Sequence, residues 1–381
     1  LKRFKEKFCF FTQQRIKGTL IWFHGASVGE IQSIIPLVEK FEKDKNIKQI
    51  LITSNTISSS KIVNSLKLKK TVHQFFPIDT NFLSKKFINF WKPSKVFFID
   101  SEIWPNTLNN LYENKIPIVL LNARITKKTF NKWMMVDSFA KSVFYKFSLC
   151  LSSSNETKSY LRKLGGKNIK FFGNLKFSQS ENKILDLDQK IKNFISIKKS
   201  WCASSTHYNE EKFCGLVHIK LKKKYKDLLT IIIPRHVNRA QSIKKELNKL
   251  NLKVHFDNPQ KKIRLDTDIY LVNSYGKTKS FYKVCKNVFL GGSLINHGGQ
   301  NPLEAVRFGC NIFHGPNIWN FREIYKFLKK RNLSNKVNNQ NQLADMINKK
   351  FQKKNYSKKI IQNLNFEGEK ILKKTYKEIC F

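Results

Sequence analysis

A carboxylate that follows small residues is the first feature of this sequence that suggests chemistry. Residues 24–30 are HGASVGE and end in Glu30. Small residues let a backbone approach a ligand closely, and a carboxylate in such a loop can act as a general base. The spacing Ser27-x-x-Glu30 also predicts a capping box, in which the Glu side chain only hydrogen-bonds the start of a helix. The spacing alone leaves both interpretations open.

A second acidic segment, DSEIWPN, occupies residues 100–106. Asp100 and Glu102 follow an apolar run and precede a Trp-Pro corner, so they are expected at the end of a strand. Two carboxylates there suit a site that needs fixed negative charge or a hydrogen-bond acceptor. The alternative is that they only offset the positive end of the next helix.

An arginine in the second half of the chain could bind a phosphate. Arg235 follows an apolar run within Pro234-Arg235-His236. A guanidinium at a strand end can hold a phosphate with paired hydrogen bonds. A surface arginine without a ligand is the simpler explanation of this motif taken alone.

A glycine-rich loop at residues 291–304 is the second candidate for anion binding. It begins with GGS and ends with GGQNPLE. Paired glycines before a helix expose backbone N–H groups, which attract anions. Asn301, Pro302 and Glu304 also fit the N-cap, N1 and N3 positions of a helix start. The cap and the anion site are compatible.

The elements that position these segments follow a regular alternation. Short runs rich in β-branched and aromatic residues alternate with amphipathic stretches, the first of them a helix expected over 30–43. This pattern predicts repeated βα units and mainly parallel sheets covered on both faces. The expected strands are 19–23, 49–53, 72–76, 95–99, 116–121, 148–151, 169–172, 201–204, 228–233, 252–255, 269–272, 288–290 and 311–313.

The length of 381 residues favours two domains, and the alternation breaks between 173 and 200. We therefore expect domains at 1–176 and 177–355, followed by a terminal helix at 356–381. Ligands of doubly wound domains bind at the carboxyl ends of the strands, so a cleft between the two domains is the expected active site.

The charge of the chain is extreme, with 72 Lys and Arg against 27 Asp and Glu and a net charge of +45. An A+T-rich coding sequence would produce the same excess of Lys, Asn, Ile and Phe. Attraction to an anionic partner is the functional explanation. A nucleic-acid-binding protein would concentrate its basic residues along one groove, whereas Lys here is spread through nearly every segment.

The seven cysteines are scattered, without a C-x-x-C pair, which predicts reduced structural thiols and no zinc site.

No apolar run approaches the roughly 20 residues that span a bilayer. The chain begins with Leu1, which is compatible with a removed N-terminal segment. Residues 1–11 alternate basic residues with Phe, and we expect them to dock on an anionic membrane.

Eight motifs, in this order, resemble those of bacterial 3-deoxy-D-manno-octulosonic acid (Kdo) transferases. They run from near residue 20 to near residue 325, which makes the resemblance more specific than any single glycine loop. The motifs are His24-x-x-Ser27-Val28-Gly29-Glu30, Glu102-Ile103-Trp104-Pro105-Asn106, Asn122-Ala123-Arg124, Gly173-Asn174-Leu175-Lys176-Phe177, Ala203-Ser204-Ser205-Thr206-His207, Pro234-Arg235-His236, Gly291-Gly292-Ser293 and Gly299-x-Asn301-Pro302-Leu303-Glu304.

The resemblance implies an α/β protein of the GT-B type, with two Rossmann-like doubly wound domains facing a cleft and a C-terminal helix. The first domain would bind the acceptor, the second CMP-Kdo, and the terminal helix could pack back on the first. The implied reaction is inverting transfer of Kdo from CMP-Kdo to a lipid A precursor (lipid IVA), without a metal or other cofactor. It would occur at the cytoplasmic face of the bacterial inner membrane, with peripheral attachment or an N-terminal anchor outside this chain.

The resemblance also assigns roles to residues. Glu30 resembles the general base, and Glu102 and Lys176 resemble residues that stabilise the transition state. The residues that resemble CMP contacts are Pro234, Arg235, Tyr275, Gly276, Lys277, Asn301, Pro302, Leu303 and Glu304. Two alternatives are kept: another GT-B nucleotide-sugar transferase, and a basic nucleic-acid-binding protein.

Three positions depart from the family pattern. Asp100 stands where Glu is usual, and Gln300 stands where His is common. Residues 273–277, NSYGK, replace a turn that is often Asp-Thr-x-Gly-Glu, so Lys277 is a base where the family has an acid. Backbone contacts at Tyr275 and Gly276 would survive this change.

Overall fold

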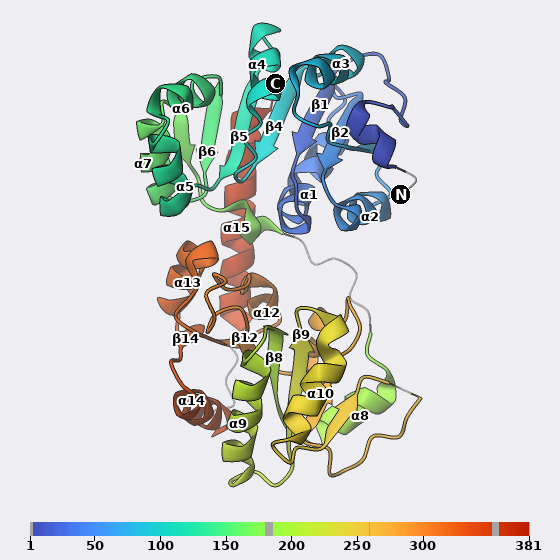
Figure 1. Cartoon of the computed structure of the whole chain (residues 1–381), viewed down its shortest axis with the longest axis vertical. Coiled ribbons are helices and arrows are strands. Elements are labelled where there is room, and N and C mark those ends of the chain that lie inside the picture. Colours follow the sequence, from blue (N-terminus) through green and yellow to red (C-terminus); the bar gives the residue numbers. More distant parts are fainter. Residues whose placement is uncertain (1–2, 180–185, 259, 353–357, 381) are drawn as a thin grey trace. The chain divides into compact units, whose positions relative to one another are not determined.

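The computed structural model describes residues 3–179, 186–258, 260–352 and 358–380 (Figure 1). The chain forms two compact units. Unit 1 contains Leu1–Ser180 and Asn365–Phe381, and unit 2 contains Glu181–Leu364. The sequence pattern places the end of the first domain at residue 176 and the end of the second at residue 355, whereas the structure divides the chain at residues 180 and 364.

Unit 1 contains a sheet of parallel strands in the order β3-β2-β1-β4-β5-β6-β7. The strand order reverses between β1 and β4, which are therefore neighbours at the topological switch point. The strands are β1 (Leu20–His24), β2 (Gln49–Ser54), β3 (Thr71–Phe75), β4 (Lys95–Ile99), β5 (Ile118–Ala123), β6 (Leu149–Ser152) and β7 (Ile169–Phe171).

The helices of unit 1 begin mostly at Ser or Thr residues. Ser27, Thr56, Thr80, Thr126 and Ser154 each accept a hydrogen bond from the third backbone N–H of the helix that follows. The elements are η1 (Phe4–Phe8), α1 (Val28–Glu42), α2 (Ile57–Ser65), α3 (Asn81–Trp91), α4 (Pro105–Glu113), α5 (Lys127–Met134), α6 (Asp137–Phe144), α7 (Asn155–Lys163), η2 (Leu175–Ser178) and the end of α15 (Lys358–Ile379).

Unit 2 contains a second parallel sheet, in the order β10-β11-β9-β8-β12-β13-β14. Here the switch point lies between β8 and β12. The elements are α8 (Gln189–Ser196), β8 (Lys199–Thr206), α9 (Glu210–Lys222), β9 (Leu228–Pro234), η3 (Val237–Arg239), α10 (Ala240–Asn248), β10 (Val254–Phe256), β11 (Ile269–Leu271), α11 (Thr278–Val284), β12 (Asn287–Leu290), α12 (Leu303–Arg307), β13 (Asn311–His314), η4 (Trp319–Phe321), α13 (Arg322–Lys329), β14 (Ser334–Lys336) and α14 (Gln340–Gln352).

The predicted fold class, α/β with two Rossmann-like doubly wound sheets, is confirmed. Every strand expected from the sequence is present, with ends shifted by no more than two residues. The expected terminal helix is also present as α15, and residues 356–357 and 381 of that prediction lie outside the described residues. The sequence pattern missed β14, because its three residues, Ser-Asn-Lys, have no apolar alternation.

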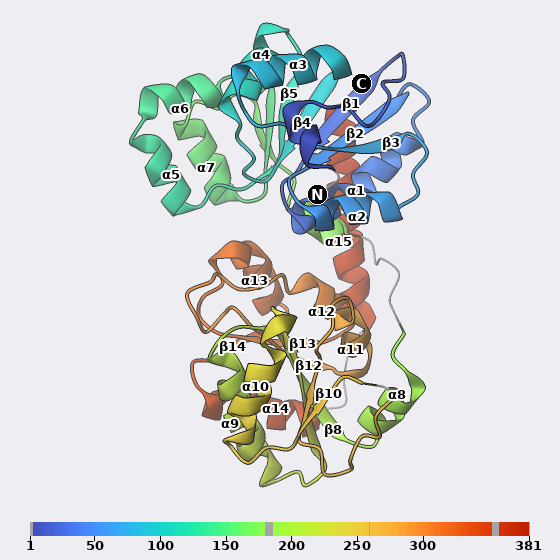
Figure 2. The ribbon, with the colours of Figure 1, turned by 45° about the vertical axis from the view of Figure 1, so that its right-hand side comes forward.

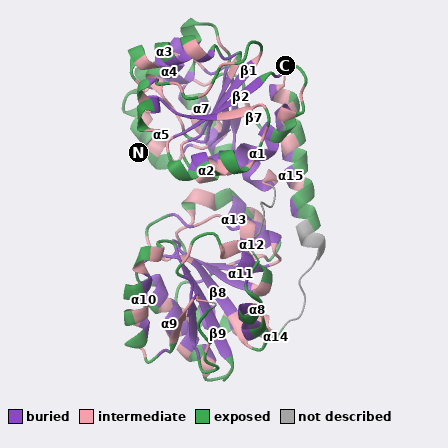
Figure 3. Cartoon of the chain, turned by 90° about the vertical axis from the view of Figure 1, so that its right-hand side faces the viewer, coloured by how far each residue is buried: buried purple, intermediate pink, exposed green. Residues whose placement is uncertain are grey.

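Alternate residues of β1 face opposite sides of the first sheet. Trp22 contacts the ring of Phe98 on one side, whereas Phe23 stacks on Phe97 at 4.5 Å on the other. Helices cover both faces, so every residue of β1 is buried. Figure 3 shows this arrangement in both units, with buried strands inside and exposed residues on the outer helices.

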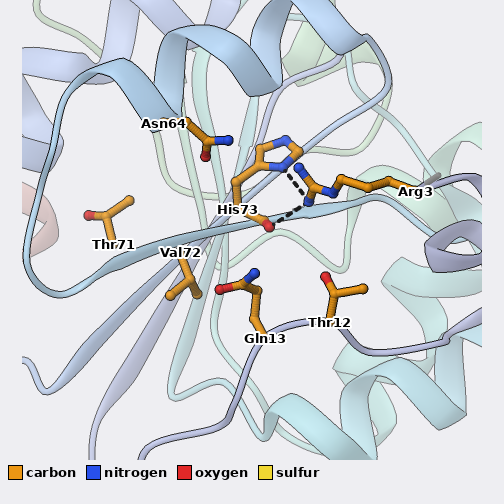
Figure 4. A pocket seen from close by; sticks show the side chains of 7 residues that line it. All are labelled: Arg3, Thr12, Gln13, Asn64, Thr71, Val72 and His73. Carbon is orange, nitrogen blue, oxygen red and sulfur yellow. Dashed lines mark hydrogen bonds between the residues drawn. The ribbon is translucent and has the colours of Figure 1, made fainter. Parts of the chain in front are cut away.

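The N-terminal segment covers part of the outer edge of β3. The Arg3 guanidinium donates to the His73 carbonyl oxygen at 2.8 Å, and the buried Glu6 carboxylate accepts the Phe75 N–H at 2.8 Å. Figure 4 shows Arg3 against His73, beside a pocket of about 370 Å³ that is also lined by Thr12. These side chains satisfy edge groups that would otherwise be open to pairing with another strand.

The last helix, α15, packs on unit 1 through its residues from Asn365 onward. The ring of Tyr376 lies 5.0 Å from that of Phe41 on α1. Figure 2 shows the ribbon of α15 next to α1. Gly368 touches the chain at η2, because a Cβ at this position would lie 2.2 Å from the Phe177 carbonyl oxygen. Among the described helices, none is long and apolar enough to cross a membrane.

We predict that Gly368→Ala lowers the free energy of unfolding of unit 1 by about 1 kcal/mol or more. The new methyl group would displace the backbone at Phe177, an overpacking cost of about 1–3 kcal/mol or more that exceeds the gain in helix propensity of about 1 kcal/mol. Urea denaturation measures the change, with the exposed neighbour Glu369→Ala as control. Equal stability of the two variants would show that α15 does not pack closely here.

Candidate functional site

Glu30 lies in the first turn of α1, at the carboxyl end of β1. Its backbone N–H donates to the Ser27 hydroxyl at 3.3 Å, and its carboxylate accepts the Ala26 N–H at 2.7 Å and the Ser27 hydroxyl at 2.9 Å. The capping box expected from the spacing is therefore present. It fixes the carboxylate over the loop at the switch point of the first sheet.

Burial, together with the negative charges of Asp100 and Glu102, raises the pKa of Glu30 to about 7. A carboxyl group with this pKa exchanges its proton near neutral pH, which suits a general base. The capping and acid–base interpretations of Glu30 are therefore compatible.

Glu102 is oriented by two ring N–H groups. It accepts the Trp104 Nε1–H at 2.9 Å, and His24 Nε2 lies 3.1 Å from the same oxygen. Burial lowers the pKa of His24, so the ring is neutral. Its Nδ1 lies 2.9 Å from the Thr53 hydroxyl, which accepts the Trp22 Nε1–H at 2.8 Å. The hydroxyl then donates to Nδ1, and Nε2–H donates to Glu102.

The alternative role for Glu102, compensation of the positive end of α4, belongs to another residue. Asp79 accepts the Asn106 N–H at 3.1 Å, and the Thr107 N–H and hydroxyl at 2.8 Å and 2.7 Å. It thereby satisfies the first N–H groups of α4. The Glu102 carboxylate is left to contact His24 and Trp104.

Lys176 reaches this acidic group through Asp100. The buried Lys176 ammonium lies 2.9 Å from one Asp100 oxygen, and the Asn122 side chain donates to the other at 2.6 Å. The Leu175 N–H in turn donates to Asn122 at 2.9 Å. Asp100 and Asn122 both have positive φ, +55° and +54°, a strained conformation that tends to occur at functional sites.

In unit 1, the structure thus brings together Glu30, Glu102 and Asp100, with Lys176 bound to Asp100. The contacts within this group were not visible in the sequence, because they join residues from separate strand ends. Among the described residues, no group of three or more His, Cys, Asp or Glu side chains could hold a metal ion. The described cysteines, six of them buried, are free thiols.

In unit 2, Pro234 ends β9 and places Arg235 beside the end of β8. The Arg235 N–H donates to the Thr206 carbonyl oxygen at 2.9 Å. Its exposed guanidinium has no hydrogen bond or ion pair with any described residue. The guanidinium is therefore available to an anionic ligand.

In the glycine-rich loop 291–304, the N–H groups of Gly292, Ser293 and Leu294 are not open to an external anion, because an internal carboxylate already occupies them. Glu210 is 1% exposed and accepts the N–H groups of Gly292 at 2.7 Å, Ser293 at 3.1 Å and Leu294 at 3.0 Å. It also accepts the His207 N–H at 3.0 Å. Glu210 thus joins the loops that follow β8 and β12.

The helix predicted to begin at Pro302, with Asn301 as its N-cap, begins one residue later. The helix α12 begins at Leu303, with Pro302 at the N-cap, and Glu304 is its second residue. The Asn301 side chain accepts the Leu303 N–H at 3.1 Å, so it caps from one position further out. Glu304 is 32% exposed, and its carboxylate lies 3.8 Å from the Lys279 ammonium.

Lys277, the base that replaces a family acid, is paired within unit 2. Its ammonium lies 2.7 Å from the carboxylate of Asp257, which also accepts the Tyr270 hydroxyl at 2.8 Å. Gly276 has φ +90°, and the Tyr275 side chain is 68% exposed. The positive charge of Lys277 is therefore offset by a buried acid.

We predict that Glu210→Ala lowers the unfolding temperature of unit 2 more than Lys212→Ala, an exposed change on the same helix. The Ala variant leaves buried N–H groups without an acceptor, and each costs about 1–3 kcal/mol. Differential scanning calorimetry measures the change. Glu210→Gln should lie between the two, since its amide keeps one acceptor oxygen; equal transitions for Glu210→Ala and Lys212→Ala would contradict this role.

Comparison with known proteins identifies the family. The model of the 3-deoxy-D-manno-octulosonic-acid transferase (kdotransferase) family matches residues 2–179. The 3-deoxy-D-manno-octulosonic acid transferase of Rickettsia bellii is 30% identical over 352 residues, which cover 91% of this chain and 83% of that protein. The Haemophilus influenzae transferase of the same name is 29% identical, covering 81% of this chain and 73% of that protein.

One solved structure resembles this chain in its fold but not in its sequence. The putative UDP-N-acetylglucosamine 2-epimerase of Listeria monocytogenes superposes with a TM-score of 0.66 at 12% identity, covering 95% of this chain and 97% of that one. The sequence relatives, with the ordered motifs from Glu30 to Glu304, establish that this chain belongs to the 3-deoxy-D-manno-octulosonic acid (Kdo) transferase family and is a glycosyltransferase.

Proposed function

We propose that this protein transfers Kdo from CMP-Kdo to a lipid A precursor with inversion, and that Glu30 is the general base. The observation that carries the proposal is a carboxyl group with a pKa of about 7, held by a capping box beside Asp100 and Glu102. A sugar hydroxyl becomes a good nucleophile only as its proton leaves, and such a carboxylate can accept that proton.

The proposed step is a single displacement. The acceptor hydroxyl gives its proton to Glu30 while its oxygen bonds the anomeric carbon of Kdo. The bond from that carbon to the CMP phosphate oxygen breaks, and CMP leaves with the electron pair. Attack on the face opposite the leaving group inverts the anomeric centre.

The charged groups of unit 1 fit the development of charge in this step. Positive charge grows on the Kdo ring as the bond to CMP breaks, and the fixed Glu102 carboxylate can stabilise it. Lys176 stays neutralised by Asp100 until a more negative group approaches. These contacts support transition-state roles for Glu102 and Lys176.

The groups of unit 2 fit the nucleotide. The Arg235 guanidinium is exposed and can pair with the CMP phosphate. The Glu304 carboxylate at the start of α12 can accept hydrogen bonds from ribose hydroxyls. The Pro234-Arg235 pair, the 275–277 turn and residues 301–304 form the proposed CMP site, for which no metal or other cofactor is proposed.

We predict that Glu30→Gln lowers kcat about a hundredfold or more, because Gln cannot accept the proton. The assay combines CMP-Kdo with a lipid A precursor and weighs the product by mass spectrometry. The control is Glu39→Gln, an exposed change on the same helix. The wild-type kcat/KM should also fall as the pH drops through about 7, since protonated Glu30 is no longer a base.

Three results would contradict these assignments. Near-normal turnover by Glu30→Gln at saturating substrates would remove Glu30 as the base. Wild-type protein that forms no Kdo-bearing lipid would contradict the proposed donor and acceptor. A product with retained anomeric configuration, determined by NMR, would contradict the inverting step.

We also propose that the N-terminal segment docks on the anionic cytoplasmic surface of the inner membrane, where a lipid acceptor would be found. Phe4, Phe8 and Phe10 are 52%, 39% and 58% exposed. Lys5 and Lys7 lie within the same turn of η1. Exposed aromatic rings beside lysines are typical of surfaces that bind anionic lipids.

We predict that replacing Phe4, Phe8 and Phe10 by Ser weakens binding to phosphatidylglycerol vesicles about tenfold or more, because their apolar area no longer enters the membrane interface. Cosedimentation measures binding, with phosphatidylcholine vesicles as the uncharged comparison. The control is Phe366→Ser, which removes a ring that is 67% exposed on α15. Unchanged binding of the triple variant would exclude this segment as the docking surface.

A further inference from the structure

His207 has an unusual position at the end of β8. It follows the switch-point strand of the second sheet, and its backbone N–H shares the Glu210 carboxylate with the glycine loop after β12. A Cβ on Gly292 would lie 3.2 Å from His207 Cε1, so the ring touches that loop. Ligands of doubly wound sheets bind at this place.

One nitrogen of the His207 ring has no partner. Nδ1 lies 3.1 Å from the Ser205 carbonyl oxygen, which only accepts, so Nδ1 carries the hydrogen. The residue is 9% exposed, and its Nε2 is buried without a hydrogen-bond partner among the described residues. An unpaired buried polar atom costs about 1–3 kcal/mol, so it needs an explanation.

The charge of the ring indicates which kind of group Nε2 can bind. Burial, together with nearby His297, His236 and Arg235, lowers the pKa of His207 to about 4. The ring is therefore neutral at physiological pH, and Nε2 offers a lone pair. A lone pair repels phosphate and carboxylate oxygens and accepts an O–H or N–H group.

We propose that His207 is a specificity-determining residue of the donor site, whose Nε2 accepts a hydrogen bond from a hydroxyl group of the bound nucleotide sugar. The inference rests on the proposed function, because it needs a hydroxyl-bearing donor at unit 2. Hydroxyls on the ribose or on the transferred sugar lie within a few bonds of the phosphate, which the nearby Arg235 can hold. The neutral imidazole would thus distinguish a hydroxylated donor from one without that group.

Two substitutions separate the roles of the ring nitrogens. His207→Asn places an amide nitrogen near the position of Nδ1, keeps the bond to Ser205 and removes Nε2. His207→Gln carries an amide to the position of Nε2 and restores an acceptor there. The matched control is His255→Asn, because His255 Nε2 is also buried with no hydrogen-bond partner in the part of the chain that the structure describes, but lies on β10 at the edge of the sheet.

The experiment measures kcat and the KM for CMP-Kdo, with the unfolding temperature of each variant. We expect His207→Asn to raise KM about tenfold with kcat nearly unchanged, since the hydroxyl contact is made before and during the reaction. His207→Gln should recover most of this loss. His255→Asn should change neither constant.

Each contrary outcome has a separate meaning. An unchanged KM for His207→Asn, with active wild-type protein, would overturn this inference and leave the proposed function intact. If the Asn and Gln variants have the same increase in KM and both have lower unfolding temperatures, His207 only stabilises the structure and the inference is wrong. A wild-type protein without turnover of CMP-Kdo would overturn the proposed function and this inference together.

Discussion

A buried carboxylate must be hydrogen-bonded or paired, and this requirement organises both candidate sites. In unit 2, the Glu210 carboxylate accepts hydrogen bonds from backbone N–H groups that follow two strands, β8 and β12. These bonds fix the conformation of the glycine-rich loop after β12. In unit 1, Asp100 binds Lys176 and Asn122 and so joins three chain segments. The shape of each site thus depends on an internal anion: Asp100, one of the two carboxylates that the sequence marked for a site, and Glu210, which the sequence did not mark.

The same requirement explains why Glu30 differs from its acidic neighbours. Asp100 has an ammonium and an amide as partners, and Glu102 has two ring N–H groups. Among the described residues, the Glu30 carboxylate accepts hydrogen bonds only from the Ser27 hydroxyl and the N–H groups of Ala26 and Ser27, in a place where two other negative charges face it. Its ionised form is therefore weakly stabilised, which is the property that a base working near neutral pH needs.

Local patterns in the sequence predicted the fold well, because hydrophobic periodicity and Ser or Thr caps act over a few residues. The capping box at Glu30 is an example. The pairings at the sites were hidden, because they join distant positions: Asp79 caps a helix at Thr107, and Asp257 neutralises Lys277. The occupation of the first N–H groups of the glycine-rich loop was hidden for the same reason, since they meet a carboxylate that lies more than 80 residues earlier in the chain.

The packing of α15 on unit 1 has a consequence for biosynthesis. Most of unit 1 precedes unit 2 in the chain, yet Gly368 and Tyr376, which cover η2 and α1, leave the ribosome only after the whole of unit 2. All residues of unit 2 emerge earlier, so unit 2 can complete its core during translation. The apolar surface of unit 1 beneath α15 therefore stays uncovered while unit 2 is synthesised, which exposes this surface to chaperones during that time.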